Sequence, residues 1–202
     1  MPDWDANSPE LQRNLREVLL KIRDQAITRG IPTVEDVREW QKPTMRGLTA
    51  DDPHYIGAFR GEKGLEDVEV KVLNNFGVPA RRVAQALKAF ERQLQAKVLL
   101  LDQALRPGVL PNAVTLQAVI ELCAWAHAEW VRIHPFANGN GRTARLLANG
   151  LALRYGLPAF VRLRPRPAAN EYARTSEQAM RGNWKPTVRV FHVLLNQSLA
   201  GS

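Results

Sequence analysis

Residues 134–145 read HPFANGNGRTAR and follow a strongly apolar segment that runs from about Thr115 to Trp130. Gly139 and Gly141 can adopt backbone conformations that other residues avoid, and successive backbone N–H groups in such a turn can surround an anion. A helical pattern resumes at about residue 141, and the first turn of a helix adds further N–H groups and a positive dipole end. The stretch therefore predicts an anion-binding loop that leads into a helix.

Three side chains add chemistry to this loop. Arg142 and Arg145 are three residues apart, so both would project from one side of the first helical turns and could grip the same polyphosphate. His134 lies at the mouth of the loop, and an ordinary histidine pKa of about 6.5 suits proton abstraction near neutral pH. A base, an anion loop and two guanidinium groups together favour phosphoryl or nucleotidyl transfer.

Helical spacing of apolar residues dominates the sequence on both sides of the loop. The expected helices start after Ser8, after Thr33 and at Pro79, and cover about 115–130, 141–155, 168–181 and 186–199. Residues 44–77 differ, because glycines are frequent and Leu65, Val68, Val70 and Val72 alternate with charged residues. This pattern predicts a short strand that pairs with residues 56–60. We therefore expect one mainly α-helical domain with a small β-hairpin.

Composition narrows the function classes. The 202 residues are 45% hydrophobic and 24% charged, which excludes disordered and fibrous proteins. No apolar run approaches the roughly 20 residues of a membrane span, and the acidic N-terminus is not typical of a signal peptide. The single Cys123 excludes a disulfide framework and a cysteine zinc site. We expect a cytoplasmic protein without a membrane partner.

The net charge of +8 is unevenly distributed. Residues 1–130 hold 17 basic and 18 acidic side chains, whereas residues 131–202 hold 11 basic and two acidic ones. Ten of those 11 cations are Arg, which favours phosphate over a solvated surface charge. Two of these arginines lie in the anion loop, so the excess positive charge indicates that the protein binds a nucleotide. We do not expect nucleic acid as a partner.

Residues 134–145 resemble the Fic-domain signature, His-x-Phe-x-acid-Gly-Asn-Gly-Arg-x-x-Arg, at every fixed position except the acidic one, where Asn138 stands. Further resemblance lies in the stretch Gly57-Ala58-Phe59-Arg60 and in Tyr172, Ala179, Gly182, Asn183 and Pro186 near the end of the chain. The resemblance implies a Fic-type helical domain over 33–202, with a flap at about 56–72 above the active site and the catalytic loop at 134–145. Residues 1–32 would form an N-terminal helical extension.

What the resemblance implies for activity is protein adenylylation, the transfer of AMP from ATP to a Ser, Thr or Tyr hydroxyl of a target protein. His134 would be the catalytic base, Phe136 would anchor the loop in the core, and the flap would pair with the target. The nucleotide would be bound by Gly139, Asn140, Gly141, Arg142 and Arg145, and the target would dock on Leu65, Val68 and Val70 of the flap.

Two departures from the family pattern bear on metal binding and on control. The acidic residue of the signature holds Mg²⁺ or Mn²⁺, and Asn138 offers only an uncharged amide oxygen, so weaker metal dependence is expected. The family's inhibitory pattern, Ser/Thr-x-x-x-Glu-Gly/Asn, does not occur in these 202 residues. A separate, antitoxin-like chain is therefore the expected source of inhibition, and the protein is expected to be toxin-like or an effector delivered into a host cell.

Two alternatives stay open at this point. One is a family variant that transfers another phosphate-containing group, such as phosphate, UMP or phosphocholine. The other is a catalytically silent module that binds a partner through the flap and the basic pocket, and Asn138 is the residue that keeps this alternative open.

Overall fold

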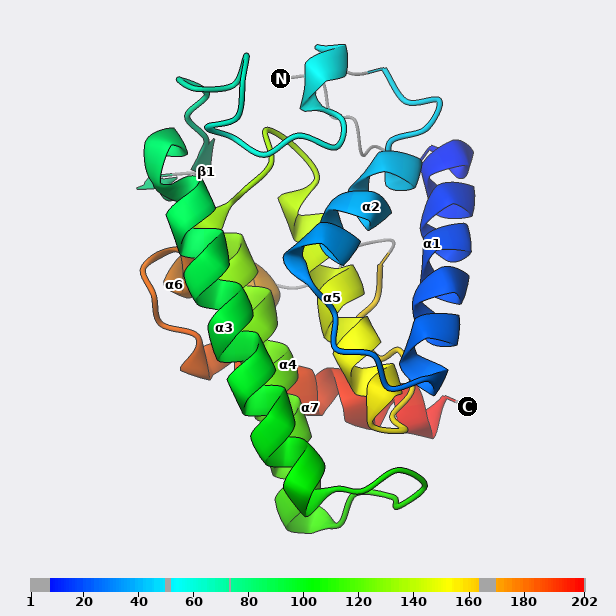
Figure 1. Ribbon diagram of the computed structural model, residues 1–202. Coiled ribbons are helices and arrows are strands. Elements are labelled where there is room, and N and C mark those ends of the chain that lie inside the picture. Colours follow the sequence, from blue (N-terminus) through cyan, green and yellow to red (C-terminus); the bar gives the residue numbers. More distant parts are fainter. Residues whose placement is uncertain (1–7, 50–51, 73, 164–169, 202) are drawn as a thin grey trace.

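Two helices at the centre of the molecule carry the anion loop between them. The computed structural model describes residues 8–49, 52–72, 74–163 and 170–201 (Figure 1). Helix α4 (Ala113–Ile133) ends directly before the loop and α5 (Asn140–Arg154) begins directly after it. Because nearly every side chain of α5 is buried, its position is fixed by packing on several sides.

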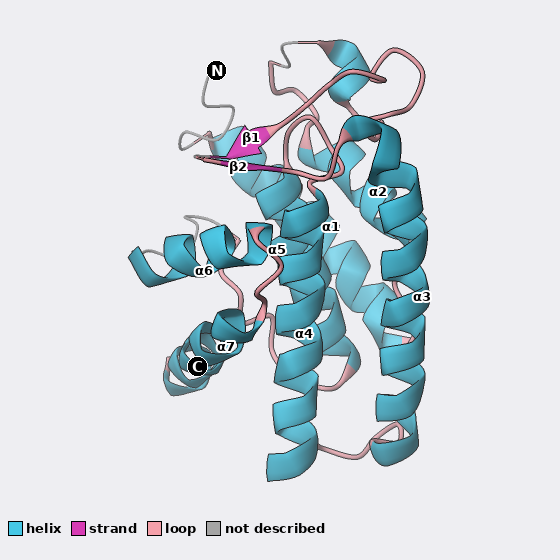
Figure 2. Ribbon diagram, turned by 90° about the vertical axis from the view of Figure 1, so that its left-hand side faces the viewer, coloured by secondary structure: helices cyan, strands magenta, loops and turns pink. Residues whose placement is uncertain are grey.

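The remaining helices surround this pair. Helices α3 (Ala80–Ala104), α6 (Asn170–Met180) and α7 (Lys185–Ala200) pack against α4, whereas α1 (Pro9–Ile27) and α2 (Val34–Thr44) pack against α5. Figure 2 shows α3 and α4 as two long neighbouring helices, with α6 and α7 on the opposite side of α4. The mainly α-helical fold class is thereby confirmed.

Short polar signals start the helices where the sequence predicts them. The Ser8 hydroxyl accepts a hydrogen bond from the Leu11 N–H, and the Thr33 hydroxyl and the Asp36 carboxylate cap α2 reciprocally. Asn112 and Thr115 form the same kind of box at the start of α4. Each cap satisfies N–H groups that have no partner within the helix and is worth about 1 kcal/mol.

The β-hairpin is smaller than predicted and lies further along the chain. Strand β1 (Lys71–Val72) pairs antiparallel with β2 (Asn75–Phe76), so the predicted pairing of residues 56–60 with a strand at 65–72 is wrong. The Gly61 N–H donates to the Leu65 carbonyl and the Leu65 N–H donates to the Glu62 carbonyl, which makes residues 61–65 a tight turn. The alternation around Leu65 therefore reflects a turn with one buried anchor.

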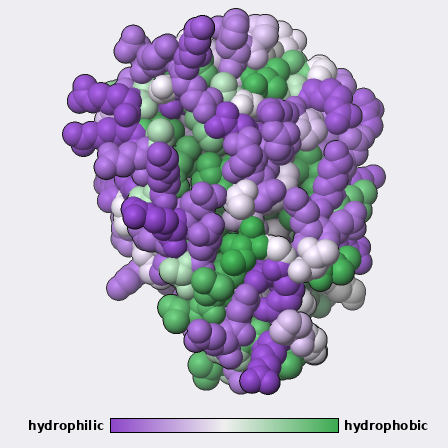
Figure 3. All heavy atoms as spheres, in the orientation of Figure 1, coloured by the Kyte–Doolittle hydropathy of each residue, from purple (hydrophilic) through white to green (hydrophobic). Residues whose placement is uncertain are grey.

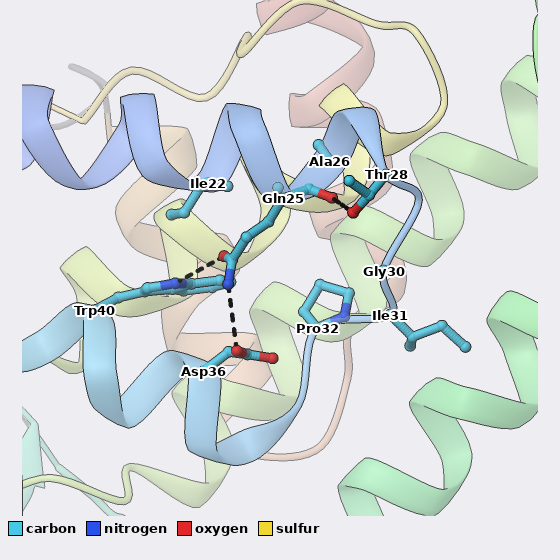
Figure 4. Close-up of a pocket in the computed structure, with 10 residues that line it drawn as sticks. Ile22, Gln25, Ala26, Thr28, Gly30, Ile31, Pro32, Asp36 and Trp40 are labelled. Atoms are coloured by element: carbon cyan, nitrogen blue, oxygen red, sulfur yellow. Dashed lines mark hydrogen bonds between the residues drawn. The ribbon is translucent and has the colours of Figure 1, made fainter.

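Helix α2 is fixed to α1 at both of its ends. At its start, the Gln25 side chain donates to Asp36 Oδ1 (3.4 Å) and accepts from Trp40 Nε1 (3.3 Å), beside a cavity of about 250 Å³ (Figure 4). At its end, the Asn14 amide donates to the carbonyls of Thr44 (3.3 Å) and Arg46 (2.7 Å). These contacts set the position of Gln41, which reaches the anion loop.

The surface shown in Figure 3 is largely polar, with apolar side chains gathered toward the end of the molecule away from the hairpin. Exposed apolar residues on that end of α3, the following loop and α4 are Leu99, Leu100, Val109, Leu110 and Val114. No helix in the described ranges is long and apolar enough to cross a membrane.

Candidate active site

His134 occupies the C-cap of α4 in the left-handed region of backbone space (φ 53°, ψ 56°). Its Nδ1 lies 2.9 Å from the Val131 carbonyl oxygen. Because a carbonyl only accepts hydrogen bonds, Nδ1 must carry the proton, and the neutral ring keeps its lone pair on Nε2. Burial lowers the pKa of His134 to about 4, so the ring is neutral at physiological pH and can accept a proton.

The backbone of the loop presents unused N–H groups. Gly139 is the N-cap of α5 with φ 90°, and the N–H groups of Arg142 and Thr143 both donate to its carbonyl. Within the described residues, the N–H groups of Gly139, Asn140 and Gly141 donate no hydrogen bond. Such a turn at a helix N-terminus can bind an anion, as the sequence predicts.

Three buried side chains hold the loop in this shape. The Asn140 amide accepts from the Phe136 N–H (2.9 Å) and donates to the Phe136 carbonyl (2.8 Å). The Thr143 hydroxyl accepts from Trp130 Nε1 (2.9 Å) and lies 3.1 Å from the Gly139 carbonyl oxygen. Phe136 is fully buried against Phe59, which confirms it as the anchor of the loop. The Asn140 side chain thus braces the loop, and only its backbone is available to an anion.

Both motif arginines lie beside the loop glycines. A β-carbon placed on Gly139 would lie 3.7 Å from Arg142 Nη2, and one on Gly141 would lie 3.4 Å from Arg145 Nη1. The Arg142 guanidinium donates to Asn138 Oδ1 (3.0 Å), and the Arg145 guanidinium donates to the Leu163 carbonyl (3.3 Å). The two guanidiniums therefore lie beside the glycines of the loop that begins at His134.

The hairpin reaches the start of this loop through Gly77, because a β-carbon there would lie only 2.8 Å from the β-carbon of His134. Leu65 is 1% exposed and packs into the core, so the prediction that it contacts a target is corrected. Val68 and Val70 are half-buried, and their carbonyls accept from Arg60 and from the Gly77 N–H. Among the described residues of the hairpin, the exposed apolar side chains are Val72 (37%) and Phe76 (62%).

Gln41 and Thr143 support the site without any sequence signal that would single them out. Gln41 is buried on α2, accepts from the Gly57 N–H (2.7 Å) and lies beside Gly139. Gln41 is about 100 residues away from the loop in sequence, and a local pattern does not report such a contact. Thr143 lies inside the motif, but at one of its variable positions.

The donor set at the loop does not fit a divalent cation held by the protein. The described residues contain no group of three or more His, Cys, Asp or Glu side chains that could hold a metal ion. Asn138 is the residue at the metal-binding position of the signature, and its amide oxygen already accepts from the Arg142 guanidinium. A hard cation prefers charged oxygens, and a neighbouring guanidinium repels it.

The same residues match a known family. The model of the Fic/DOC family covers residues 31–152, which include the hairpin, the anion loop and all but the last two residues of α5. The chain belongs to the Fic/DOC family. The predicted Fic resemblance is thus confirmed.

Related sequences carry the same family name. A protein adenylyltransferase Fic from Nematostella vectensis is 44% identical over 71 residues, which cover 35% of this chain and 16% of that protein. Another from Drosophila sechellia is 40% identical over 157 residues, which cover 78% of this chain and 27% of that protein. The chain thus spans no more than about a quarter of the length of these curated relatives.

Solved structures support the Fic fold. A Fic domain containing signaling protein from Bacteroides thetaiotaomicron superposes with a TM-score of 0.67 at 21% identity, over 95% of this chain and 70% of that one. The BepC effector protein from Bartonella tribocorum, solved with bound AMPPNP, superposes with a TM-score of 0.62 at 17% identity, over 95% and 90% of the two chains.

Proposed function

We propose that this Fic/DOC chain is a protein adenylyltransferase that moves AMP from ATP to a hydroxyl side chain of a target protein. The observation that supports the proposal is that His134, whose Nδ1 donates to the Val131 carbonyl and whose lone pair is therefore on Nε2, begins the loop that carries unused N–H groups and two neighbouring guanidiniums. The names of the related adenylyltransferases and the AMPPNP bound to the Bartonella protein support the same nucleotide chemistry.

In the proposed reaction, the N–H groups of Gly139, Asn140 and Gly141 bind phosphate oxygens, and Arg142 and Arg145 neutralise the β- and γ-phosphates. His134 Nε2 takes the proton of the target hydroxyl as its oxygen forms a bond to the α-phosphorus. The bond between the α-phosphorus and the bridging oxygen breaks, and pyrophosphate leaves toward the arginines. Positioning of the reactants and neutralisation of the phosphate charge account for most of the rate acceleration in such transfers. No step is assigned to a metal ion.

The hairpin is the proposed docking site for the target. An extended target segment can add to a β-hairpin through main-chain hydrogen bonds. We assign the apolar contacts to the exposed Val72 and Phe76, with Val68 and Val70 contributing as half-buried neighbours.

The decisive experiment uses ATP labelled at the α- or the γ-phosphate with a panel of hydroxyl-bearing proteins. We expect α-label on protein with the unchanged chain and its loss with His134→Ala. His192→Ala is the matched control, because His192 lies on α7 and pairs with Gln117. Transfer of γ-label instead would indicate a kinase. Failure of both labels to transfer, with ATP binding retained, would support the silent binding module.

We also propose that a separate, antitoxin-like chain inhibits the enzyme. The inhibitory pattern is missing from the 202 residues, and Arg145 Nε is buried without a hydrogen-bond partner in the described part of the chain. In this proposal a carboxylate of the inhibitor pairs with the Arg145 guanidinium and displaces the γ-phosphate. The isolated chain should be active, and an isolated chain that binds ATP but becomes active only after an end helix is removed would contradict this. The toxin-like role, the cytoplasmic location and the division of the chain after residue 32 stay predictions.

A further inference from the structure

Arg60 is a buried cation near the site whose side chain donates five hydrogen bonds. Its side chain is 0% exposed and lies between the loop 57–61, the hairpin and the end of α4. Nε donates to the His134 carbonyl (2.7 Å), and Nη2 donates to the carbonyls of Ile133 (3.1 Å) and Val78 (2.7 Å). Nη1 donates to the Val68 carbonyl (3.1 Å) and to Glu69 (3.2 Å).

These partners fall into two groups that are far apart in sequence. Val68 lies three residues before β1 and Val78 lies two residues after β2, so Arg60 joins the two chain segments that enter and leave the hairpin. Ile133 and His134 end α4, and the backbone N–H of Arg60 also donates to the carbonyl of the next residue, Pro135 (2.8 Å). One guanidinium therefore fixes both the base of the hairpin and the backbone that carries the imidazole.

The close packing between the hairpin and His134 leaves little room for either to move independently of the other. His134 is held in the left-handed region, which is unfavourable for a residue with a β-carbon and persists only where the surroundings impose it. Gly77 packs so closely that a β-carbon there would approach both the His134 β-carbon (2.8 Å) and Arg60 Nη2 (2.9 Å). A shift at the base of the hairpin is therefore transmitted to His134.

We propose that Arg60 is a positioning residue that couples docking of a target on the hairpin to the orientation of the His134 imidazole. The proposal rests on the proposed transfer reaction for its functional meaning, but the coupling itself is a property of the free chain. Glu69 extends the connection, because its second oxygen accepts from the Ala80 N–H at the start of α3 (3.0 Å).

Electrostatics agrees with this placement. Burial lowers the pKa of His134 most, the Val131 carbonyl raises it, and the charge of Arg60 lowers it. Arg60 thus adds to the effect of burial, which is the main reason that the imidazole is unprotonated.

The test compares two variants of Arg60. Arg60→Met has a similar side-chain volume but no hydrogen-bond donors, whereas Arg60→Lys keeps the positive charge but has fewer donors. Arg181→Met is the matched control, because Arg181 donates to Asn75 of the hairpin (3.1 Å) from an exposed position. Amide hydrogen exchange at residues 68–78 and 134–136 and the NMR signals of the His134 ring report the coupling without any substrate. Transfer rates and ATP affinity are measured in parallel.

With Arg60→Met we expect faster exchange in both segments, a shifted His134 ring signal and a loss of kcat of about 100-fold, with ATP affinity changed less than about threefold. Arg60→Lys should recover part of the rate, and Arg181→Met should leave the ring signal unchanged. Faster exchange at residues 68–78 alone, with an unchanged His134 signal, would overturn the coupling. An inactive unchanged chain would count against the proposed reaction, while exchange and NMR would still decide the coupling.

A second variant covers the case in which Arg60→Met does not fold. Glu69→Gln removes one charged partner of Arg60 and keeps an oxygen for the Ala80 N–H. It should produce a smaller shift of the His134 signal in the same direction, and an unchanged signal in this folded variant would contradict the proposal.

Discussion

The imidazole of His134 is prepared to accept a proton before any substrate binds. The Val131 carbonyl fixes the proton on Nδ1, and the pKa of about 4 keeps the ring neutral. A base with so low a pKa would take a proton weakly, but the negative charge of a bound triphosphate favours the protonated form. Substrate binding should therefore strengthen the base.

An NMR titration of the histidine ring signals tests this expectation. The pKa of His134 should be about 4 in the free chain and should rise on addition of a non-hydrolysable ATP analogue. Transfer activity should increase as the pH rises through the pKa of His134, because only the neutral ring accepts a proton. The signal of His192 on α7 should not respond to the analogue. A His134 pKa that falls or stays constant on analogue binding would contradict the proposed role.

Asn138 allows a test of the metal requirement. Because its oxygen accepts from Arg142 and has no charge, chelation of divalent cations should reduce the affinity for an ATP analogue by less than about tenfold. Asn138→Asp supplies a charged oxygen and should increase Mn²⁺ binding in the presence of the analogue, which the relaxation rate of water protons reports. Equal Mn²⁺ binding by the two chains would show that residue 138 does not determine metal affinity.

The hairpin, the anion loop and the end of α4 act as one structural unit because their backbones are in direct contact. Gly77 lies at the closest point, where its hydrogen atom faces the β-carbon of His134. Neither Gly77 nor its neighbours has an unusual backbone angle, so close approach is the reason for glycine here.

Gly77→Ala is accordingly expected to displace the hairpin from His134. The added methyl group would lie 2.8 Å from a β-carbon that cannot rotate away. We expect transfer activity to fall about tenfold or more, with ATP affinity nearly unchanged, because the nucleotide loop is not touched. Gly30→Ala is the matched control, since its nearest neighbours would lie at 3.8 Å and its backbone angle is ordinary. Equal activity of the two variants would argue against the contact.

Local patterns predicted the helices, the caps at Ser8 and Thr33 and the glycine turn before α5, because spacing, capping residues and glycine act over a few residues. They did not predict the hairpin position, because the burial of Leu65 depends on residues that fold against it from elsewhere. Arg60 was identifiable only as part of a motif, and its role follows from carbonyls 8 to 74 residues away. Gln41 was missed for the same reason. Long-range contacts of this kind produce no periodic pattern in the sequence.

The stability of the whole fold depends on pH through His127, a histidine of α4 that faces α6 and α7. His127 is buried, its Nε2 lies 2.8 Å from the Tyr172 hydroxyl, and its ring contacts Phe191, so it joins α4 to α6 and α7. Burial lowers the pKa of His127 to about 3, and the charge of Arg145 lowers it as well. The unfolded chain binds the proton more tightly, so stability is greatest above about pH 6.5 and declines as the pH falls toward 3.

The free energy of unfolding should therefore decrease between pH 7 and pH 5, by at most about 1.4 kcal/mol per pH unit for each histidine of this kind. His134 contributes with the same sign. Urea unfolding of His127→Gln should show a shallower pH dependence than the unchanged chain, because the variant lacks the buried group whose pKa is lowered by folding. A slope that is identical in the unchanged and His127→Gln chains would contradict this linkage.

The left-handed backbone at the end of α4 implies a conflict between catalysis and folding. Helices commonly end on glycine in this conformation, and a residue with a β-carbon is less favourable there by about 1 kcal/mol. His134→Gly should therefore be more stable than His134→Ala by about that amount in urea unfolding, and equal stability would show that no strain is present. Selection for stability alone would place glycine at position 134. A histidine at this position is consistent with the proposed catalytic role, for which the chain would give up part of its folding free energy.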